Sequence, residues 1–426
     1  MRHIGSIGLI VLFCFLTTFA TAAVEPAKTH FDYRRETVAA YQAKDYPAML
    51  AACEAALQLR PDSPRYFYNL AIAQLLTAQP DAALGTLHQL AGLGISMSIA
   101  RSEDLAPLRE RPEFAAILNT MAGNLAPHGK LTTLHELPET AGILEGLAWR
   151  ESTGDLFVGD VHQRCIWRIG ADGRLVPFTK SEDLYGVFGL GVDEARDALW
   201  AATSSLPEIA GYSDAIKGRA ALAEISLKTG ELRRLIPVPE DGREHVLGDL
   251  TLAPDGTVYL TDSVAPIIWR LLPDATELEI FCESTTFASL QGIGLIHRGK
   301  SLLVSDYANG LHVIELATRK IHSLTPPAYV TLLGMDGLLV SNEAIYAVQN
   351  GISPQRVVRF TLTPSSDTIT DFAVVASGLP GMEDLTLISL VSGRPTFIAG
   401  SGWTQFDGAK EPPPPHPSRI LQLPTP

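Results

Sequence analysis

The stretch Glu145-Gly146-Leu147-Ala148 opens a unit of sequence that returns five more times along the chain. Each unit has a short apolar segment typical of a strand, a turn, a second such segment ending in small or polar residues, and further strand-like sequence. Successive copies start 43, 61, 42, 45 and 48 residues apart, a period typical of four-stranded propeller blades. The other copies begin Phe188-Gly189-Leu190-Gly191, Asp249-Leu250-Thr251-Leu252, Gln291-Gly292-Ile293-Gly294, Asp336-Gly337-Leu338-Leu339 and Asp384-Leu385-Thr386-Leu387.

The predicted fold is therefore an all-β six-bladed propeller over residues 131–426, preceded by a small all-α domain of helical repeats over residues 30–125. The segment 131–137 is strand-like but belongs to no complete blade, while the last copy lacks an outer strand. We expect this early strand to complete the last blade and close the ring, because closure removes exposed sheet edges.

The first position of each copy is expected at the same height beside the propeller axis. Carboxylates gathered there repel one another unless a cation or protons lie among them. A hard cation such as Ca²⁺ takes about six to eight oxygen ligands from carboxylates, amides, carbonyls and water. The alternative is that each acid separately is a turn or cap residue. The predicted ligands of a divalent cation, Ca²⁺ in our interpretation, are Glu145, Asp249, Gln291, Asp336 and Asp384.

Composition and the N-terminus narrow the functional classes. The net charge of −14 argues against nucleic acid and anionic membrane surfaces as partners, since both recruit basic patches.

The N-terminus is typical of a secretory signal over residues 1–22, with Arg2, an apolar run over 7–19 and small residues at 20–22. A permanent anchor is the alternative, but the run is shorter than the roughly 20 residues that span a bilayer. We expect an exported protein, periplasmic or secreted, with no membrane attachment once the signal is removed.

The segment before the propeller has a different pattern. Residues 44–50 recur as 78–84, an offset of 34 residues, and apolar residues at helical spacing follow both copies. This region resembles tetratricopeptide repeats, which have that period. It is either a docking surface for a partner peptide or a brace that packs on the propeller, and the sequence leaves both interpretations open.

From about residue 131 onward the chain resembles the senescence-marker-protein/gluconolactonase family of six-bladed propellers. In that family, Glu, Asn, Asn and Asp from blades one, three, four and five bind a divalent cation. Glu145, within 144–149, matches the first ligand motif and Asp336 the last, whereas Asp249 and Gln291 stand where the family usually has Asn. The resemblance implies that the cation polarises a lactone or ester carbonyl while a carboxylate or His activates water. It also implies that Asp336 is general base as well as ligand.

Further candidates come from loops expected at the same face. His245 precedes Asp249 by four residues and is a candidate proton shuttle; the alternative is a solvated loop histidine. The long blade-two loop 204–219 is interpreted as a lid that brings Tyr212 and Arg219 over a ligand, or else as a disordered or packing insertion. The predicted substrate-binding residues are Tyr212, Arg219 and Trp403, and other loop-end residues aimed at this face are Ser263, Tyr307 and Asn350.

The sequence thus favours an exported, divalent-metal-dependent hydrolase of a lactone or related small ester. The alternative is a non-catalytic scaffold, in which the propeller and the helical repeats bind protein partners in the cell envelope. The sequence leaves open whether the protein is an enzyme at all.

Overall fold

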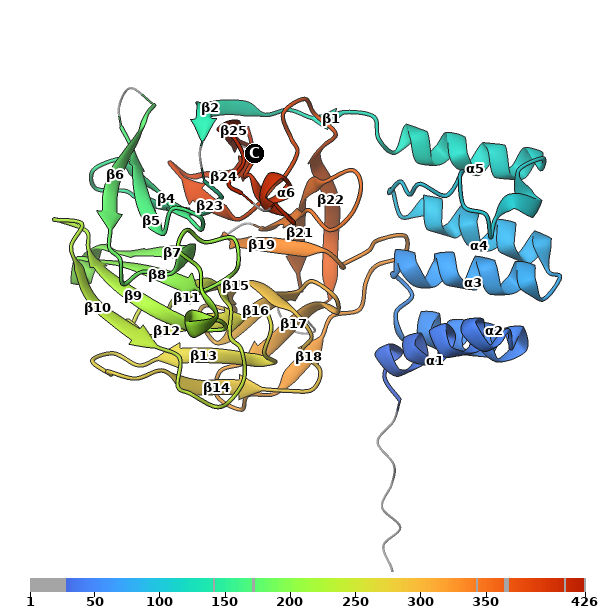
Figure 1. Cartoon of the computed structure of the whole chain (residues 1–426), viewed down its shortest axis with the longest axis horizontal. Coiled ribbons are helices and arrows are strands. Elements are labelled where there is room, and N and C mark those ends of the chain that lie inside the picture. Colours follow the sequence, from blue (N-terminus) through green and yellow to red (C-terminus); the bar gives the residue numbers. More distant parts are fainter. Residues whose placement is uncertain are drawn as a thin grey trace, which may run out of the picture.

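The computed structural model describes residues 28–140, 142–170, 173–341, 344–363, 368–409 and 411–424. It places a helical region beside a six-bladed β-propeller (Figure 1), which confirms the predicted fold class. The predicted signal segment lies outside the described residues, so its removal and the export of the protein stay predictions. Within the described ranges, no helix combines the length and the hydrophobicity that crossing a membrane requires.

The helical region occupies residues 30–123 and joins its helices through short turns. Three of its helices begin at a proline, at Pro64, Pro80 and Pro112, where the missing N–H is one that the first turn could not satisfy anyway. That these helices are tetratricopeptide repeats stays a prediction. The helices are α1 (His30–Ala43), α2 (Tyr46–Leu59), α3 (Pro64–Leu76), α4 (Pro80–Gly92) and α5 (Pro112–Gly123), with a 3₁₀ turn η1 (Ala106–Leu108) before α5.

The first three blades are consecutive four-stranded antiparallel sheets. Blade one contains β3 (Leu144–Arg150), β4 (Asp155–Asp160), β5 (Cys165–Ile169) and β6 (Leu175–Lys180). Blade two contains β7 (Gly186–Asp193), η2 (Glu194–Arg196), β8 (Ala198–Ser204), η3 (Asp214–Ile216), β9 (Ala220–Ser226) and β10 (Leu232–Pro237). Blade three contains β11 (Leu247–Leu252), β12 (Val258–Asp262), β13 (Ile267–Leu271) and β14 (Glu279–Glu283).

The last three blades include both strands that precede the ring. Blade four contains β15 (Leu290–Ile296), β16 (Ser301–Asp306), β17 (Gly310–Glu315) and β18 (Ile321–Ser323). Blade five contains β19 (Met335–Val340), β20 (Ile345–Gln349), β21 (Arg356–Leu362), β22 (Ile369–Ser377) and the short β1 (His128–Gly129). Blade six contains β23 (Ile388–Val391), β24 (Arg394–Ala399), β25 (His416–Gln422) and β2 (Thr132–Thr140), with the short α6 (Trp403–Phe406) between β24 and β25.

The ring closes as predicted. The early strand β2 pairs antiparallel with β25, with Thr132 opposite Gln422 and Leu137 opposite Ser418, and so becomes the outer strand of blade six. The chain enters the propeller at the outside of its last blade, which ties both ends of the ring together by hydrogen bonds.

Apolar side chains fill the space between neighbouring blades. In β4, Leu156 and Val158 pack toward blade six, whereas Phe157 between them packs toward blade two, as the two-residue period of a strand requires. In the described part of the chain, such a cluster lies at each of the blade-to-blade junctions. The six first strands therefore stand around the axis, each in contact with the next.

Glycines let these innermost strands approach one another. A Cβ on Gly292 would lie 2.5 Å from the Asp336 carbonyl oxygen and 2.5 Å from the Leu338 nitrogen, which is closer than packed atoms approach.

We predict that Gly292→Ala lowers the free energy of unfolding by about 3 kcal/mol through overpacking. Thermal unfolding followed by circular dichroism measures this change. Gly85→Ala, in α4 and with open space around its Cβ, is the control and is expected to stabilise by up to about 1 kcal/mol. Equal melting temperatures for parent and Gly292→Ala would contradict the prediction.

Candidate functional site

A cavity of about 380 Å³ lies at the propeller axis, where the first strands begin. All five predicted ligands and one of the three predicted substrate-binding residues line this cavity, although they come from five blades and are separated by up to 258 residues. In the described lining, no residue is Lys, Arg or His. The predicted residues in its wall are Glu145, Asp249, Gln291, Asp336, Asp384 and Trp403.

Glu145 lies in the innermost strand of blade one and is almost completely buried. Its Oε2 accepts a hydrogen bond from Trp403 Nε1, across the junction of blades six and one. Burial raises the pKa of Glu145 well above its usual range, the charge of Asp336 raises it further, and the Trp403 hydrogen bond opposes both. Glu145 therefore favours either a proton or a bound cation.

Asp336 holds the corresponding place in blade five, with a buried carboxylate. Burial raises its pKa to about 6, although a 2.7 Å hydrogen bond from Asn350 Nδ2 to its Oδ2 favours the charged form. Asn350 follows β20 and also donates to the Leu385 carbonyl at 2.8 Å. Its Oδ1 is buried and accepts no hydrogen bond, so an amide oxygen without a donor lies next to the Asp336 carboxylate that this side chain binds.

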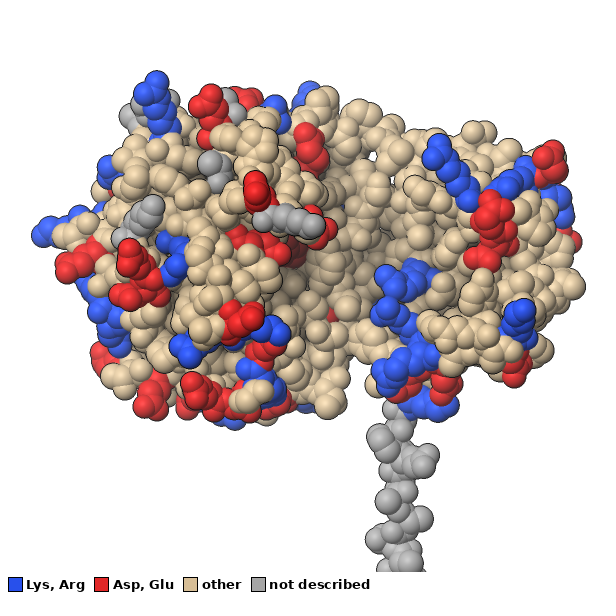
Figure 2. Space-filling model, in the orientation of Figure 1, with Lys and Arg blue, Asp and Glu red and all other residues tan. Residues whose placement is uncertain are grey.

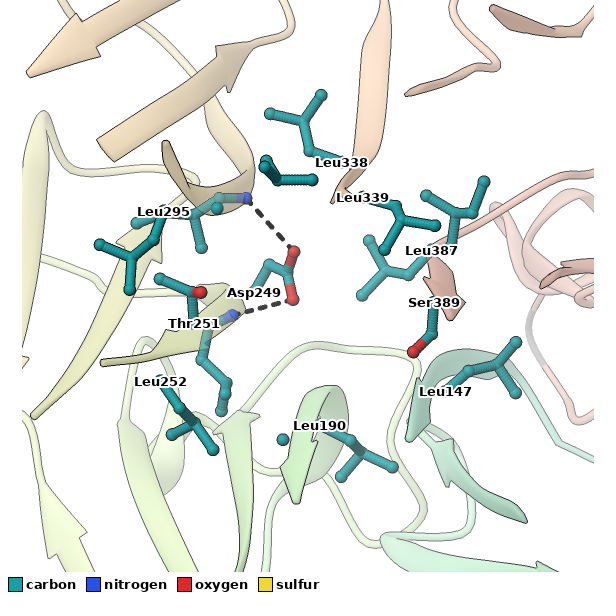
Figure 3. A pocket seen from close by; sticks show the side chains of 16 residues that line it. Leu147, Leu190, Asp249, Thr251, Leu252, Leu295, Leu338, Leu339, Leu387 and Ser389 are labelled. Carbon is teal, nitrogen blue, oxygen red and sulfur yellow. Dashed lines mark hydrogen bonds between the residues drawn. The ribbon is translucent and has the colours of Figure 1, made fainter. Parts of the chain in front are cut away.

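Asp249 in blade three is the third buried carboxylate. It accepts backbone N–H bonds from Leu250 at 2.8 Å and from Ile293 at 3.4 Å. Burial raises the pKa of Asp249 to about 7, and the two N–H bonds only partly offset this effect. Figure 3 shows its carboxylate pointing into a second cavity, of about 310 Å³, among the leucines at the other end of the axis. Asp249 lines both cavities, so its carboxylate lies where the two halves of the channel meet.

The two remaining predicted ligands are already held by neighbours. Asp384 precedes β23 with φ of 52°, and its Oδ2 accepts bonds from Ser401 Oγ at 2.9 Å and Gly402 N at 2.8 Å. Gln291 donates to Ser289 Oγ at 3.2 Å and accepts from Ser263 Oγ at 3.4 Å. Asp384 thus braces a turn, which agrees with the alternative that such an acid is a turn or cap residue. It still borders the cavity.

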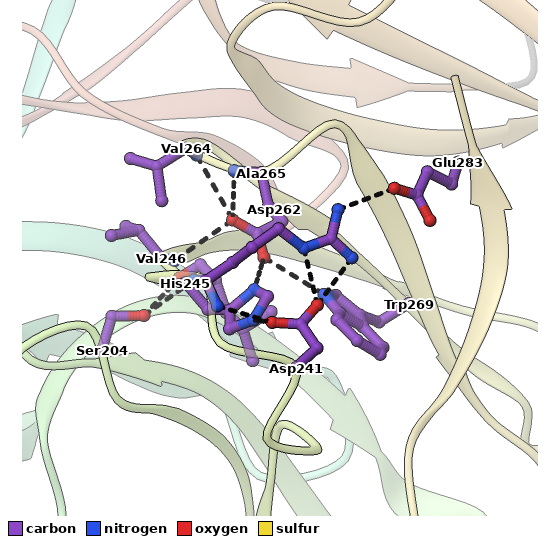
Figure 4. Close-up of polar contacts among 11 residues, drawn as sticks. Ser204, Asp241, His245, Val246, Asp262, Val264, Ala265, Trp269 and Glu283 are labelled. Atoms are coloured by element: carbon purple, nitrogen blue, oxygen red, sulfur yellow. Dashed lines mark hydrogen bonds and ion pairs between the residues drawn. The ribbon is translucent and has the colours of Figure 1, made fainter. Parts of the chain in front are cut away.

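The structure does not bring His245 to this cavity. Its Nδ1 lies 2.7 Å from Asp262 Oδ2 and its Nε2 lies 3.0 Å from Asp241 Oδ1, so both ring nitrogens are engaged (Figure 4). Burial disfavours the charged ring, but the hydrogen bonds to Asp262 and Asp241 outweigh it and raise the pKa of His245. The predicted proton shuttle is instead held between the buried Asp262 and the exposed Asp241.

Two predicted substrate-binding residues also lie elsewhere. The ring of Tyr212 packs against the apolar cluster between blades two and three, and Arg219 is exposed. Neither belongs to the cavity lining. The position of Tyr212 agrees with the alternative of a packing insertion for loop 204–219.

The loop-end residues Ser263, Tyr307 and Asn350 line the cavity as predicted, whereas the prediction did not include Gln355. Gln355 Oε1 accepts a hydrogen bond from Leu385 N at 2.9 Å. Its position after β20, in the same kind of loop as Asn350, is the sequence signal that would have identified it.

The donor set of the cavity partly fits a cation. In the described residues, no three His, Cys, Asp or Glu side chains are grouped closely enough to hold a metal ion by themselves. Glu145 and Asp336 offer carboxylate oxygens, and Asn350 offers its unsatisfied amide oxygen. An all-oxygen set of this kind suits a hard ion such as Ca²⁺ and needs further ligands such as water.

Comparison with known proteins identifies folds rather than a family. Neither a protein-family profile nor a curated protein matches the chain. Solved structures similar to it include a gluconolactonase from Xanthomonas campestris (TM-score 0.48, 18% identity, covering 71% of this chain and 93% of that one). An aldose sugar dehydrogenase from Streptomyces coelicolor has a TM-score of 0.47 and 14% identity, covering 70% and 99% of the two chains. A virginiamycin B lyase from Staphylococcus aureus has a TM-score of 0.45 and 12% identity, covering 69% and 99%.

Proposed function

We propose that this protein is a hydrolase of small polar lactones or related esters, and that the axial cavity is its active site with a divalent cation, Ca²⁺ by preference. The observation that carries the proposal is an axial cavity in which Glu145, Asp249 and Asp336 are buried without a cationic side chain in the described lining. Buried carboxylates without a counter-ion are costly, and such an arrangement is typical of sites that bind a cation or move protons.

The residues take separate roles in this proposal. Glu145, Asp336 and Asn350 Oδ1 would hold the cation, with Gln291 at the edge of the set. When bound, such an ion polarises a carbonyl oxygen and so favours attack on the carbonyl carbon. Trp403 fixes the Glu145 carboxylate through its N–H.

Asp336 is the proposed general base. Its carboxylate lines the cavity, where it can reach a water bound beside the cation, and position is the first requirement of a general base. The attacking water gives its proton to Asp336 as its oxygen bonds to the carbonyl carbon. The C–O bond of the ester then breaks, and the leaving oxygen takes that proton, which yields a hydroxy acid from a lactone.

The decisive experiment is a metal assay on untreated purified protein together with hydrolysis of a panel of sugar lactones and simple esters. We expect bound divalent metal, turnover that EDTA abolishes, and recovery when CaCl₂ is added back. Glu145→Gln should lose turnover, whereas the exposed variant Asp214→Asn should keep it. A protein that contains no metal and hydrolyses nothing, but retains a protein partner in pull-downs, would favour the envelope scaffold instead. The proposal includes export, which fractionation of producing cells tests.

A further inference from the structure

The helical region is fastened to the loops that form one side of the cavity. Ser96 N donates to the Ser353 carbonyl at 2.7 Å, and Arg356 Nη1 donates to the Gly94 carbonyl at 3.3 Å. His30 Nε2 lies 3.0 Å from Asn309 Oδ1. The loops reached in this way follow β16 and β20, and the same loops carry Tyr307, Asn350 and Gln355 into the cavity. Figure 2 shows the molecule hollowed between the propeller and the helical region, with Lys and Arg along the helical edge of the hollow.

A buried ion pair lies at the centre of this contact. Arg60 Nη2 is 2.9 Å from Asp62 Oδ2, and the two side chains are only 8% and 1% exposed. Both partners also bind the propeller. Arg60 Nη1 donates to the Asn309 carbonyl at 2.6 Å, and Asp62 Oδ2 accepts the Leu332 N–H at 2.9 Å. Removing either partner would leave the other as an unsatisfied buried charge, so the contact depends on both.

The two propeller segments that this pair holds meet at Tyr307. Asn309 is two residues after Tyr307, and Leu332 is two residues before Gly334, whose N–H donates to the Tyr307 carbonyl at 2.9 Å. A Cβ on Gly351 would lie 2.7 Å from both Cζ and the hydroxyl oxygen of Tyr307, so the ring lies directly on that backbone. Burial raises the pKa of Tyr307 to about 12, and the charge of Asp336 adds to this effect. The phenol is therefore a neutral hydrogen-bond donor at the cavity.

We infer that Arg60 and Asp62 are positioning residues for the cavity: by holding the Asn309 and Leu332 backbones, they fix Tyr307 against Gly351 with its hydroxyl beside Asp336. The helical region is thereby part of the functional site, in line with the brace interpretation of its sequence. Tyr307 is then a donor to the polar groups of a bound lactone or ester. The role of Tyr307 toward substrate rests on the proposed function, whereas the mechanical link from Asp62 to Tyr307 does not.

Hydrogen exchange of the full chain tests the link without any ligand. In Asp62→Ala, the amides of Leu332 and Gly334 are expected to exchange about tenfold faster or more. The Leu332 N–H loses its acceptor, and Gly334, two residues further on, is no longer held in place by the Leu332 contact. Asp81→Asn, which breaks an exposed ion pair with Arg111 in the same helical region, should leave these rates unchanged. Arg60→Lys is a milder second variant, used in case Asp62→Ala does not fold, because it keeps a cation beside Asp62. It should speed amide exchange in the segment around Asn309. Parent rates at Leu332 and Gly334 in Asp62→Ala would overturn the inference.

A double-mutant cycle tests whether the effect passes through Tyr307. With the lactone that is hydrolysed fastest, we expect Asp62→Ala to lower kcat/KM about tenfold, mainly through KM. In the Tyr307→Phe background, the same change should cost less than about threefold, because the positioned hydroxyl is already absent. Equal losses in both backgrounds would overturn the assignment. If no lactone is hydrolysed at all, the proposed function fails, and the exchange rates alone decide the positioning role.

Discussion

Replacing Asp336 by Asn is expected to lower kcat/KM for lactone hydrolysis by about 10³-fold and to abolish measurable Ca²⁺ binding. The substitution keeps the size of the side chain but removes the base and one carboxylate ligand. Burial raises the pKa of Glu145, and the charge of Asp336 raises it further. The variant removes that charge, so Glu145 should ionise at lower pH than in the parent. Isothermal titration with CaCl₂ and initial rates with the best lactone measure the two effects.

Asp262→Asn is the matched control for this variant. Asp262 is fully buried and ends β12 in blade three. Its oxygens bind His245 and the N–H groups of Val246 and Ala265, and it does not line the cavity. Its loss should lower the melting temperature and leave Ca²⁺ affinity and kcat/KM within about threefold of the parent. If Asp336→Asn keeps its turnover, or if both variants lose turnover equally, Asp336 is not the base.

The repeat explains why the centre of the site could be predicted. Glu145, Asp249 and Asp336 occupy the same place in their units, and rotation of one blade into the next carries that place around the axis. Their convergence needs no knowledge of any loop. A related regularity holds for Asp262 and Asp306, which end the second strands β12 and β16 and accept N–H bonds from the turns that follow.

The rest of the site depends on contacts that no local pattern encodes. His245 is close in sequence to Asp249, yet its two ring nitrogens contact Asp241 and Asp262, and Asp262 is 17 residues away at the end of β12. The same holds for the helical region. Arg60 and Asp62 lie in a turn between helices, and nothing in that turn shows that its partners are Asn309 and Leu332, more than 240 residues away.

The charge of Asp249 is expected to destabilise the cation-free protein. Its pKa is about 7 in the folded chain and close to 3.8 when the chain is unfolded. A carboxylate with a raised folded pKa contributes stability that is present below the unfolded pKa and lost as pH rises through the folded pKa. Asp336, with a pKa of about 6, acts in the same direction. Without divalent cations, the protein should therefore become less stable between about pH 4 and pH 7, with the loss complete by pH 8.

Asp249→Asn should remove the larger part of this loss. One pKa unit corresponds to about 1.4 kcal/mol. The amide can accept only one of the two backbone N–H bonds well, so we expect a gain of about 2 kcal/mol in EDTA at pH 8 and little change at pH 4. Added CaCl₂ should stabilise the parent more than the variant, because the Asp249 charge in the wall of the same cavity attracts the ion, and an ion that binds only the folded chain stabilises it more the more tightly it binds. Thermal melts of both proteins at the two pH values, with and without CaCl₂, measure all of these effects. A variant that melts below the parent in EDTA at pH 8 would mean that the Asp249 carboxylate already has a favourable partner in the cation-free protein. The cost of a buried charge, which a bound ion is proposed to offset, would then not exist at Asp249.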